Sequence, residues 1–209
     1  MNYLKIIKYL ASLFAFIAMP SPSYASDDVE LESAIIFNTS CAQCHEGECS
    51  GRLSYHLPKE SMDRHIYRHG GTMSVETTQQ LFILLRYMKE ECRFYPLKIS
   101  VEDQNSWGMK ALARLHAPSG KAYFIPLGWV EPGLYRLLIH GLDAKTRVCI
   151  EIINSEFDFV IEENMDHEGR QKELSFQVKK GSDLFLRIKS HMPITLNRIE
   201  LIEKAKSPD

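Results

Sequence analysis

The sequence predicts an α+β protein made of two parts: a small all-α domain over residues 26–95, then an antiparallel β-sandwich of jelly-roll type over residues 96–209. Two observations support this prediction. Apolar residues in the first part recur at helical spacing, whereas the second part is a series of short runs in which apolar and polar residues alternate. A third observation, an apolar leader over residues 1–25, indicates an exported protein.

The leader has the pattern of a secretory signal peptide. Lys5 and Lys8 precede an apolar run of eleven residues, Tyr9–Met19, and a small-x-small cleavage pattern ends at Ala25. The run is shorter than the roughly 20 residues that a membrane-spanning helix needs. We therefore expect cleavage rather than an uncleaved anchor, no membrane span after cleavage, and a periplasmic location in a bacterium.

The charge balance argues against a nucleic-acid partner. The formal net charge is −2, and removal of the leader takes away two lysines and no acidic residue. The remaining chain is mildly acidic and has no basic cluster, whereas contacts with phosphates require clustered Lys and Arg.

The stretch CAQCH contains the residues with the clearest chemistry, Cys41, Cys44 and His45. A zinc site would need a second pair of ligands at similarly close spacing. A thioredoxin-like CxxC should follow a strand and begin a helix, whereas the segment DDVELESAIIFNTS before the motif is predicted to be helical. The histidine directly after the second cysteine favours one covalent haem c: the two thiols add to porphyrin vinyl groups, and His45 ligates the iron. A disulfide with a surface histidine remains the alternative.

The order of features over residues 27–93 resembles a class I c-type cytochrome domain, in which a helix leads into CxxCH and a second helix crosses the first. The second helix is SVETTQQLFILLRYMKEE, with its start at Ser74 and an apolar stripe formed by Leu81, Leu84, Leu85 and Met88. The first helix lacks the glycine often found at the crossing, and no proline follows His45 at the usual spacing.

The resemblance also implies a second axial ligand. Met73 stands in GGTM, just before the last helix, where the family places its distal methionine, so Met73 is the predicted ligand. The alternatives are one of the histidines His56, His65 and His69, the methionine Met62, or no protein ligand at all. Met88 is interpreted as core, and the pair His65 and His69 is interpreted as solvated.

Five cysteines are an odd number for an exported chain. Cys49 follows the CAQCH loop and Cys92 ends the last helix of the first part. Because exported proteins ordinarily oxidise a close pair, these two are predicted to form a disulfide. Cys149, in a strand-like run, is predicted to be free.

The second part contains seven strand-like runs, and their rhythm resembles galactose-binding and carbohydrate-binding modules. The runs are AYFIPL, GLYRLLIHGL, RVCIEIIN, FDFVIEE, ELSFQVK, DLFLRIKS and PITLNRIELIEK. A glycan or a protein is therefore a candidate ligand of this domain. Trp107 and Trp129 are candidates for stacking on a sugar ring, although packing in the core is the favoured interpretation of both.

These observations predict an exported monohaem c-type cytochrome that acts as an electron carrier or as the redox subunit for a periplasmic partner. We expect an electron-transfer protein rather than an enzyme, because no nucleophile stands beside a recognisable base. Two alternatives remain open. One is a haem enzyme or sensor with an open iron site, and the other is a module that binds a glycan or a partner and carries an accessory haem.

Overall fold

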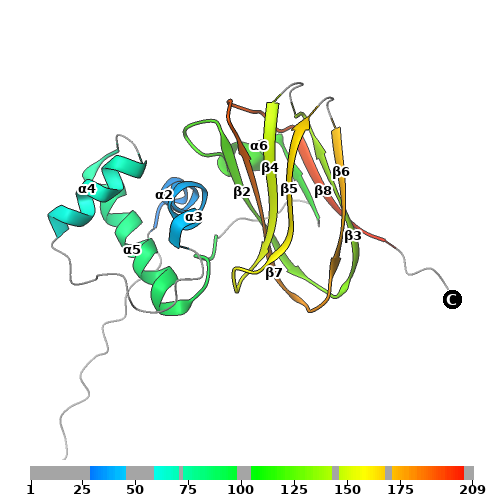
Figure 1. Cartoon of the computed structure of the whole chain (residues 1–209), viewed down its shortest axis with the longest axis horizontal. Coiled ribbons are helices and arrows are strands. Elements are labelled where there is room, and N and C mark those ends of the chain that lie inside the picture. Colours follow the sequence, from blue (N-terminus) through cyan, green and yellow to red (C-terminus); the bar gives the residue numbers. More distant parts are fainter. Residues whose placement is uncertain are drawn as a thin grey trace, which may run out of the picture.

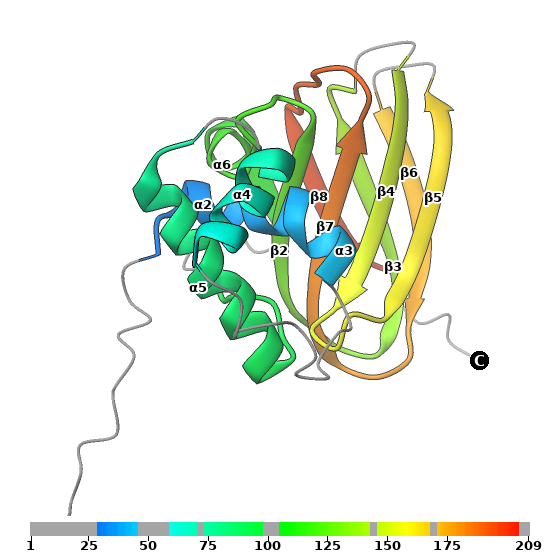
Figure 2. The same ribbon diagram turned by 60° about the vertical axis from the view of Figure 1, so that its left-hand side comes forward.

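The structure, a computed structural model, describes residues 29–45, 59–70, 73–97, 105–142, 146–167 and 171–204. Within these ranges eight strands form two four-stranded sheets, and helices α2 to α5 lie together on one side of the sheets (Figures 1 and 2). No helix in the described ranges is both long and apolar enough to cross a membrane.

The strands pair in antiparallel fashion throughout both sheets. The first sheet has the order β1 (Ser106–Gly108), β8 (Arg198–Glu203), β3 (Gly133–His140), β6 (Gln171–Val178). The second has the order β2 (Ala122–Val130), β7 (Ser182–Ser190), β4 (Thr146–Asn154), β5 (Phe159–His167). The antiparallel β-sandwich is therefore confirmed, and each of the seven predicted runs overlaps one strand.

Two elements of this part were not predicted. Strand β1 has only three residues, which is too short for alternation to be visible in the sequence. It leads directly into α6 (Met109–Arg114), a helix of six residues without a side-chain cap. Trp107, in β1, is only 1% exposed, so its predicted place in the core is confirmed.

The core of the sandwich follows from the period of two in the strands. Residues that alternate along each strand turn to the same face, and the apolar ones meet between the sheets, where they are essentially inaccessible to solvent. Those with 0% exposure include Ile125, Leu137, Ile139, Ile150, Ile152, Leu184, Leu186, Ile188 and Ile199.

The helical layer consists of α2 (Leu31–Ile36), the π-helix η2 (Phe37–Cys41), α3 (Ala42–His45), α4 (Lys59–Gly70) and α5 (Val75–Glu91). Helix α5 starts as predicted, because the Ser74 side chain accepts a hydrogen bond of 3.0 Å from the backbone N–H of Thr77. The predicted stripe is confirmed as well, since all four of its residues are buried: Leu81, Leu84, Leu85 and Met88.

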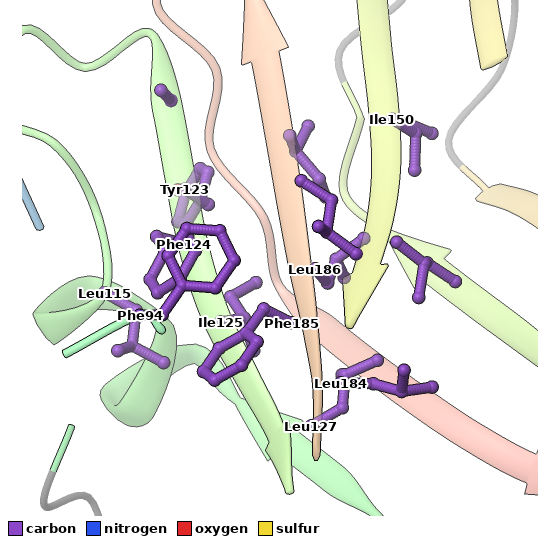
Figure 3. Packing of buried hydrophobic residues seen from close by; sticks show 14 of the residues in the cluster. Phe94, Leu115, Tyr123, Phe124, Ile125, Leu127, Ile150, Leu184, Phe185 and Leu186 are labelled. Carbon is purple, nitrogen blue, oxygen red and sulfur yellow. The ribbon is translucent and has the colours of Figure 1, made fainter. Parts of the chain in front are cut away.

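The helices do not show the all-α cytochrome c fold that the sequence predicted; they pack against the sheet β2-β7-β4-β5. Phe94, just after α5, is 3% exposed. Its ring centroid lies 5.3 Å from that of Phe124 in β2, 5.0 Å from that of Phe185 in β7, and 4.7 Å from that of Phe157 (Figure 3). The helical layer and the sandwich therefore share one apolar core.

The disulfide prediction is tested at one of its two cysteines. Cys92 is disulfide-bonded, and its predicted partner Cys49 lies outside the described ranges, so the pairing of these two cysteines stays a prediction. Cys41, Cys44 and Cys149 are free thiols. The prediction that Cys149 is free is thus confirmed.

A buried charge network joins the sheet to the helical layer. In β7, Arg187 is 1% exposed, and its Nε donates a hydrogen bond of 2.5 Å to Oε2 of Glu151 in β4. Lys189 pairs with the other carboxylate oxygen, and Nη1 of Arg187 donates to the backbone oxygen of Asn38 in η2 at 3.3 Å. Burial alone would raise the pKa of Glu151, but the hydrogen bond from Lys189 and the charge of Arg187 outweigh it and lower the pKa.

Strands β5 and β6 lie at the outer edges of the two sheets. Their exposed side chains include the carboxylates of Glu162, Asp166 and Glu173 and, at the start of β5, the aromatic ring of Phe159. Lys172 of β6 pairs with Glu163 of β5 across the two sheets at 3.6 Å. Apart from Phe159, the edges of the sandwich on this side therefore expose mainly polar and charged side chains.

We expect Glu151→Gln to destabilise the protein by about 3 kcal/mol or more, because it leaves the Arg187 guanidinium buried without its counter-charge. The free energy of unfolding from urea titration at pH 7 is the measurement. Glu162→Gln is the matched control, because Glu162 is the exposed cross-strand neighbour of Glu151. If Glu151→Gln and Glu162→Gln had the same free energy of unfolding, Glu151 would not be the essential counter-charge of Arg187.

The same network predicts a pH dependence. Because the pKa of Glu151 is lowered in the folded protein, its stabilisation is fully present above its ordinary value of 4.5 and is lost as the pH falls through the lower folded value. The stability gap between the wild type and Glu151→Gln should therefore shrink in acid. If the difference in free energy of unfolding between the wild type and Glu151→Gln grew below pH 4.5, the expected direction of the pH dependence would be wrong.

Candidate functional site

A small pocket of about 70 Å³, open to solvent, lies at the CAQCH stretch. Three helical segments contribute its walls. The lining residues are Phe37, Ser40, Cys41, Cys44 and His45 from η2 and α3, His65, Ile66 and His69 from α4, and Leu81 and Leu85 from α5.

The first wall is one face of a continuous helical segment. Its lining residues are separated by three or four positions, the spacing that brings side chains to one side of a helix. Two polar side chains donate hydrogen bonds within the segment: Thr39 donates to the backbone oxygen of Ile35 at 2.7 Å, and Gln43 donates to that of Thr39 at 2.6 Å. The π-helical turn Phe37–Cys41 is a rare feature that is frequent at functional sites, and it ends at the first cysteine of CAQCH.

Three imidazole rings stand at this cavity. The ring centroids of His45 and His65 are 6.0 Å apart with an interplanar angle of 72°, and those of His65 and His69 are 4.7 Å apart. His65 and His69 lie four residues apart on α4, so both face the same side of that helix. Both are exposed, so the interpretation of them as a solvated pair is confirmed, although they also line this pocket. Their spacing was the available signal that both could reach one site.

The structure does not bring Met73 to this cavity. Met73 lines a neighbouring cavity of about 210 Å³ together with Glu32, Ile36 and Thr39, and Ser40 belongs to the walls of both cavities. Of the other candidates for the second axial position, Met88 is 2% exposed in the core, Met62 packs against the core, and His56 lies outside the described residues. Met73 as a ligand stays a prediction.

The cysteine thiols differ in environment. Burial, reinforced by the charge of the neighbouring Cys44, raises the pKa of the Cys41 thiol to about 11, whereas the Cys44 side chain is exposed. A dithiol that exchanges disulfides needs a thiolate at ordinary pH and therefore a lowered pKa. The environment of Cys41 does not favour that chemistry.

The described residues also lack a preformed metal cluster at CAQCH. Within those ranges, three Cys, His, Asp or Glu ligand atoms come close enough to share an ion at Cys149, Glu151 and Glu162, in the sandwich. Glu151 there is already paired with Arg187 and Lys189. At CAQCH the thiols and the imidazole instead border an apolar space, an arrangement that suits a flat apolar group attached at its rim better than a single ion held in a tetrahedron.

Comparisons with known proteins assign no family. No family model and no curated protein matches the chain. Among solved structures, a family 35 carbohydrate-binding module from Clostridium thermocellum has 10% identity and a TM-score of 0.31, over 40% of this chain and 70% of the module. A ruminal GH26 endo-β-1,4-mannanase has 11% identity and a TM-score of 0.34, over 54% of this chain and 28% of the mannanase. The Anabaena sensory rhodopsin transducer has 15% identity and a TM-score of 0.27, over 37% of this chain and 85% of that protein.

We expect iodoacetamide to label Cys44 much faster than Cys41 in the folded chain with unmodified thiols at pH 8, because Cys41 is half-buried and largely protonated there. Peptide mapping after timed quenching is the measurement. Labelling in urea should bring the two rates together, and the Cys41 rate should rise as the pH approaches 11. Equal rates in the folded protein would contradict the described environment.

Proposed function

We propose that the CAQCH stretch carries one covalent haem c and that the protein is an exported monohaem redox protein, which exchanges electrons with a periplasmic partner. The observation that supports this proposal most directly is the cavity at Cys41, Cys44 and His45. Its other walls are mainly apolar, and the two thiols and the imidazole are the groups that attach and ligate a c-type haem.

Each group at the cavity has a distinct task in this proposal. Cys41 and Cys44 form the two thioether links, and His45 provides the proximal imidazole. Phe37, Leu81 and Leu85 exclude water from the buried side, which keeps the local dielectric low. A haem bound there would supply one-electron transfer, while the residues around it set the potential and the access of partners.

The remaining axial position decides between an electron carrier and an open iron site. Met73 is the proposed ligand. It immediately precedes the Ser74 cap of α5, and its cavity adjoins the CAQCH cavity through the shared residue Ser40. His65 and His69 already line the CAQCH cavity and are the competing ligands. With none of the three bound, the protein would fit the alternative of a haem enzyme or sensor.

Covalent attachment has a direct test. The exported protein from a host with haem-attachment machinery should carry one haem per chain, which acidified acetone does not extract and which a pyridine haemochrome spectrum identifies as c-type. Cys41→Ala and Cys44→Ala should each lose a thioether and most of the covalent haem. Cys149→Ala is the matched control and should retain it, because Cys149 is a free thiol in the sandwich. A wild-type chain that is exported and folded without haem would overturn the proposal.

The axial ligand is tested by comparing three variants. If Met73 binds the iron, Met73→Ala should bind carbon monoxide readily in the ferrous form and should have a lower reduction potential. His65→Ala and His69→Ala should keep the wild-type visible spectrum. The opposite pattern, with Met73→Ala unchanged and one histidine variant altered, would identify a bis-histidine site.

A second candidate function is recognition of a glycan or a protein by the sandwich. One observation favours it. Trp129 in β2, which the sequence interpretation assigned to packing, is 62% exposed. An aromatic ring of this size at the surface of a folded domain is a common anchor for a ligand. This function does not depend on the haem, so the two candidate functions can be tested separately.

A further inference from the structure

The local backbone of β2 explains why Trp129 faces solvent. Phe124 and Pro126 lie opposite Arg187 and Phe185 of β7, on the face of the sheet that carries the helical layer. Strict alternation would turn residue 129 to the opposite face, between the sheets. The pairing shifts between Pro126 and Gly128, where β2 has one extra residue and Gly128 has a positive φ of 78°.

This bulge reverses the orientation of the residues that follow it. A slip of one residue moves every later side chain to the other face of a sheet. Val130 is therefore buried, with 4% exposure, and Trp129 is turned outward. Bulges that re-aim a side chain are typical of binding sites.

The exposed indole is also held in place. Its Nε1 donates a hydrogen bond of 2.9 Å to Oε1 of Glu131. Its ring lies against the backbone at Gly181, where a Cβ atom would stand 3.0 Å from Cζ2 of Trp129. A freely rotating surface side chain has neither restraint, so the ring is preorganised and would lose little rotamer entropy on binding a ligand.

Carboxylates flank the ring. Asp183 is the direct cross-strand partner of Trp129 and is exposed, so its Cβ lies about 5 Å from that of Trp129. Glu131 lies beyond the end of the strand. Lys180, in the preceding turn, forms an exposed ion pair with Glu156 at 3.8 Å. The ring is thus bordered by hydrogen-bond acceptors that carry negative charge.

We propose that Trp129, Glu131 and Asp183 form a binding site for a neutral saccharide. The C–H face of a pyranose ring is apolar and stacks on a flat aromatic surface, while its hydroxyl groups donate hydrogen bonds to the carboxylates at the rim. The negative charge of Glu131 and Asp183 disfavours acidic sugars. The proposal deepens the second candidate function and is independent of the haem.

The test uses isothermal titration calorimetry of the whole protein as it is purified, whatever its haem content, with cellohexaose, mannohexaose, xylohexaose and, as an acidic probe, hexagalacturonic acid. We expect at least one neutral hexaose to bind and the acidic probe not to bind. Trp129→Ala should weaken that binding at least tenfold, Trp129→Phe less, and Asp183→Asn by a few-fold.

Phe159→Ala is the matched control, since Phe159 is another exposed aromatic residue in the same sheet, with 51% exposure, and should bind as the wild type does. Failure of all three neutral hexaoses to bind would overturn the proposal, as would a Trp129→Ala variant that binds as tightly as the wild type. Binding of tetramethylammonium at Trp129 in place of the sugars would assign the ring to a cation and would overturn it as well. The visible spectrum of each sample reports haem content, so loss of the haem and loss of the saccharide site are distinguishable.

Discussion

The ion pair between Arg187 and Glu151 is the constraint on which the position of the CAQCH stretch depends. Both side chains are nearly inaccessible to solvent, and a buried charge is tolerated only when its partner is in place. Arg187 also donates to the backbone of Asn38, which lies 149 residues away in the sequence and three residues before Cys41. The sheet therefore holds the turn from which the cavity is built. Phe94, packed among the aromatic rings of the sheet, adds an apolar attachment at the other end of the helical layer.

Local patterns in the sequence were sufficient for the elements that depend on near neighbours. The seven longer strands followed from alternation, and α5 followed from its cap at Ser74 and its apolar stripe. The contacts that place these elements are not local. No pattern in the sequence indicated that Arg187 would meet Asn38, or that Phe94 would lie among residues of β2 and β7.

The residues of the two proposed sites also fall into two groups: those that the sequence reveals, and those whose position depends on how distant segments pack. Cys41, Cys44 and His45 are adjacent in the sequence, and their chemistry is visible there. The place of His65 and His69 at the same cavity depends on how α4 packs, and the exposure of Trp129 depends on a single extra residue in β2. If strict alternation is applied across the bulge, it wrongly predicts that the Trp129 side chain points between the sheets. Both proposed sites therefore depend on the same sheet, β2-β7-β4-β5, whose outer face carries the helical layer and, beyond the bulge, the exposed indole.

The edge strands β5 and β6 have a consequence for how copies of the protein can meet. An unpaired strand at the end of a sheet offers hydrogen-bonding groups to any other extended chain. Glu162 and Glu173 are exposed on these strands, so two copies that joined edge to edge would bring like charges against each other. Addition of a further strand at either edge is therefore disfavoured, and the sandwich is closed to growth by sheet extension on this side.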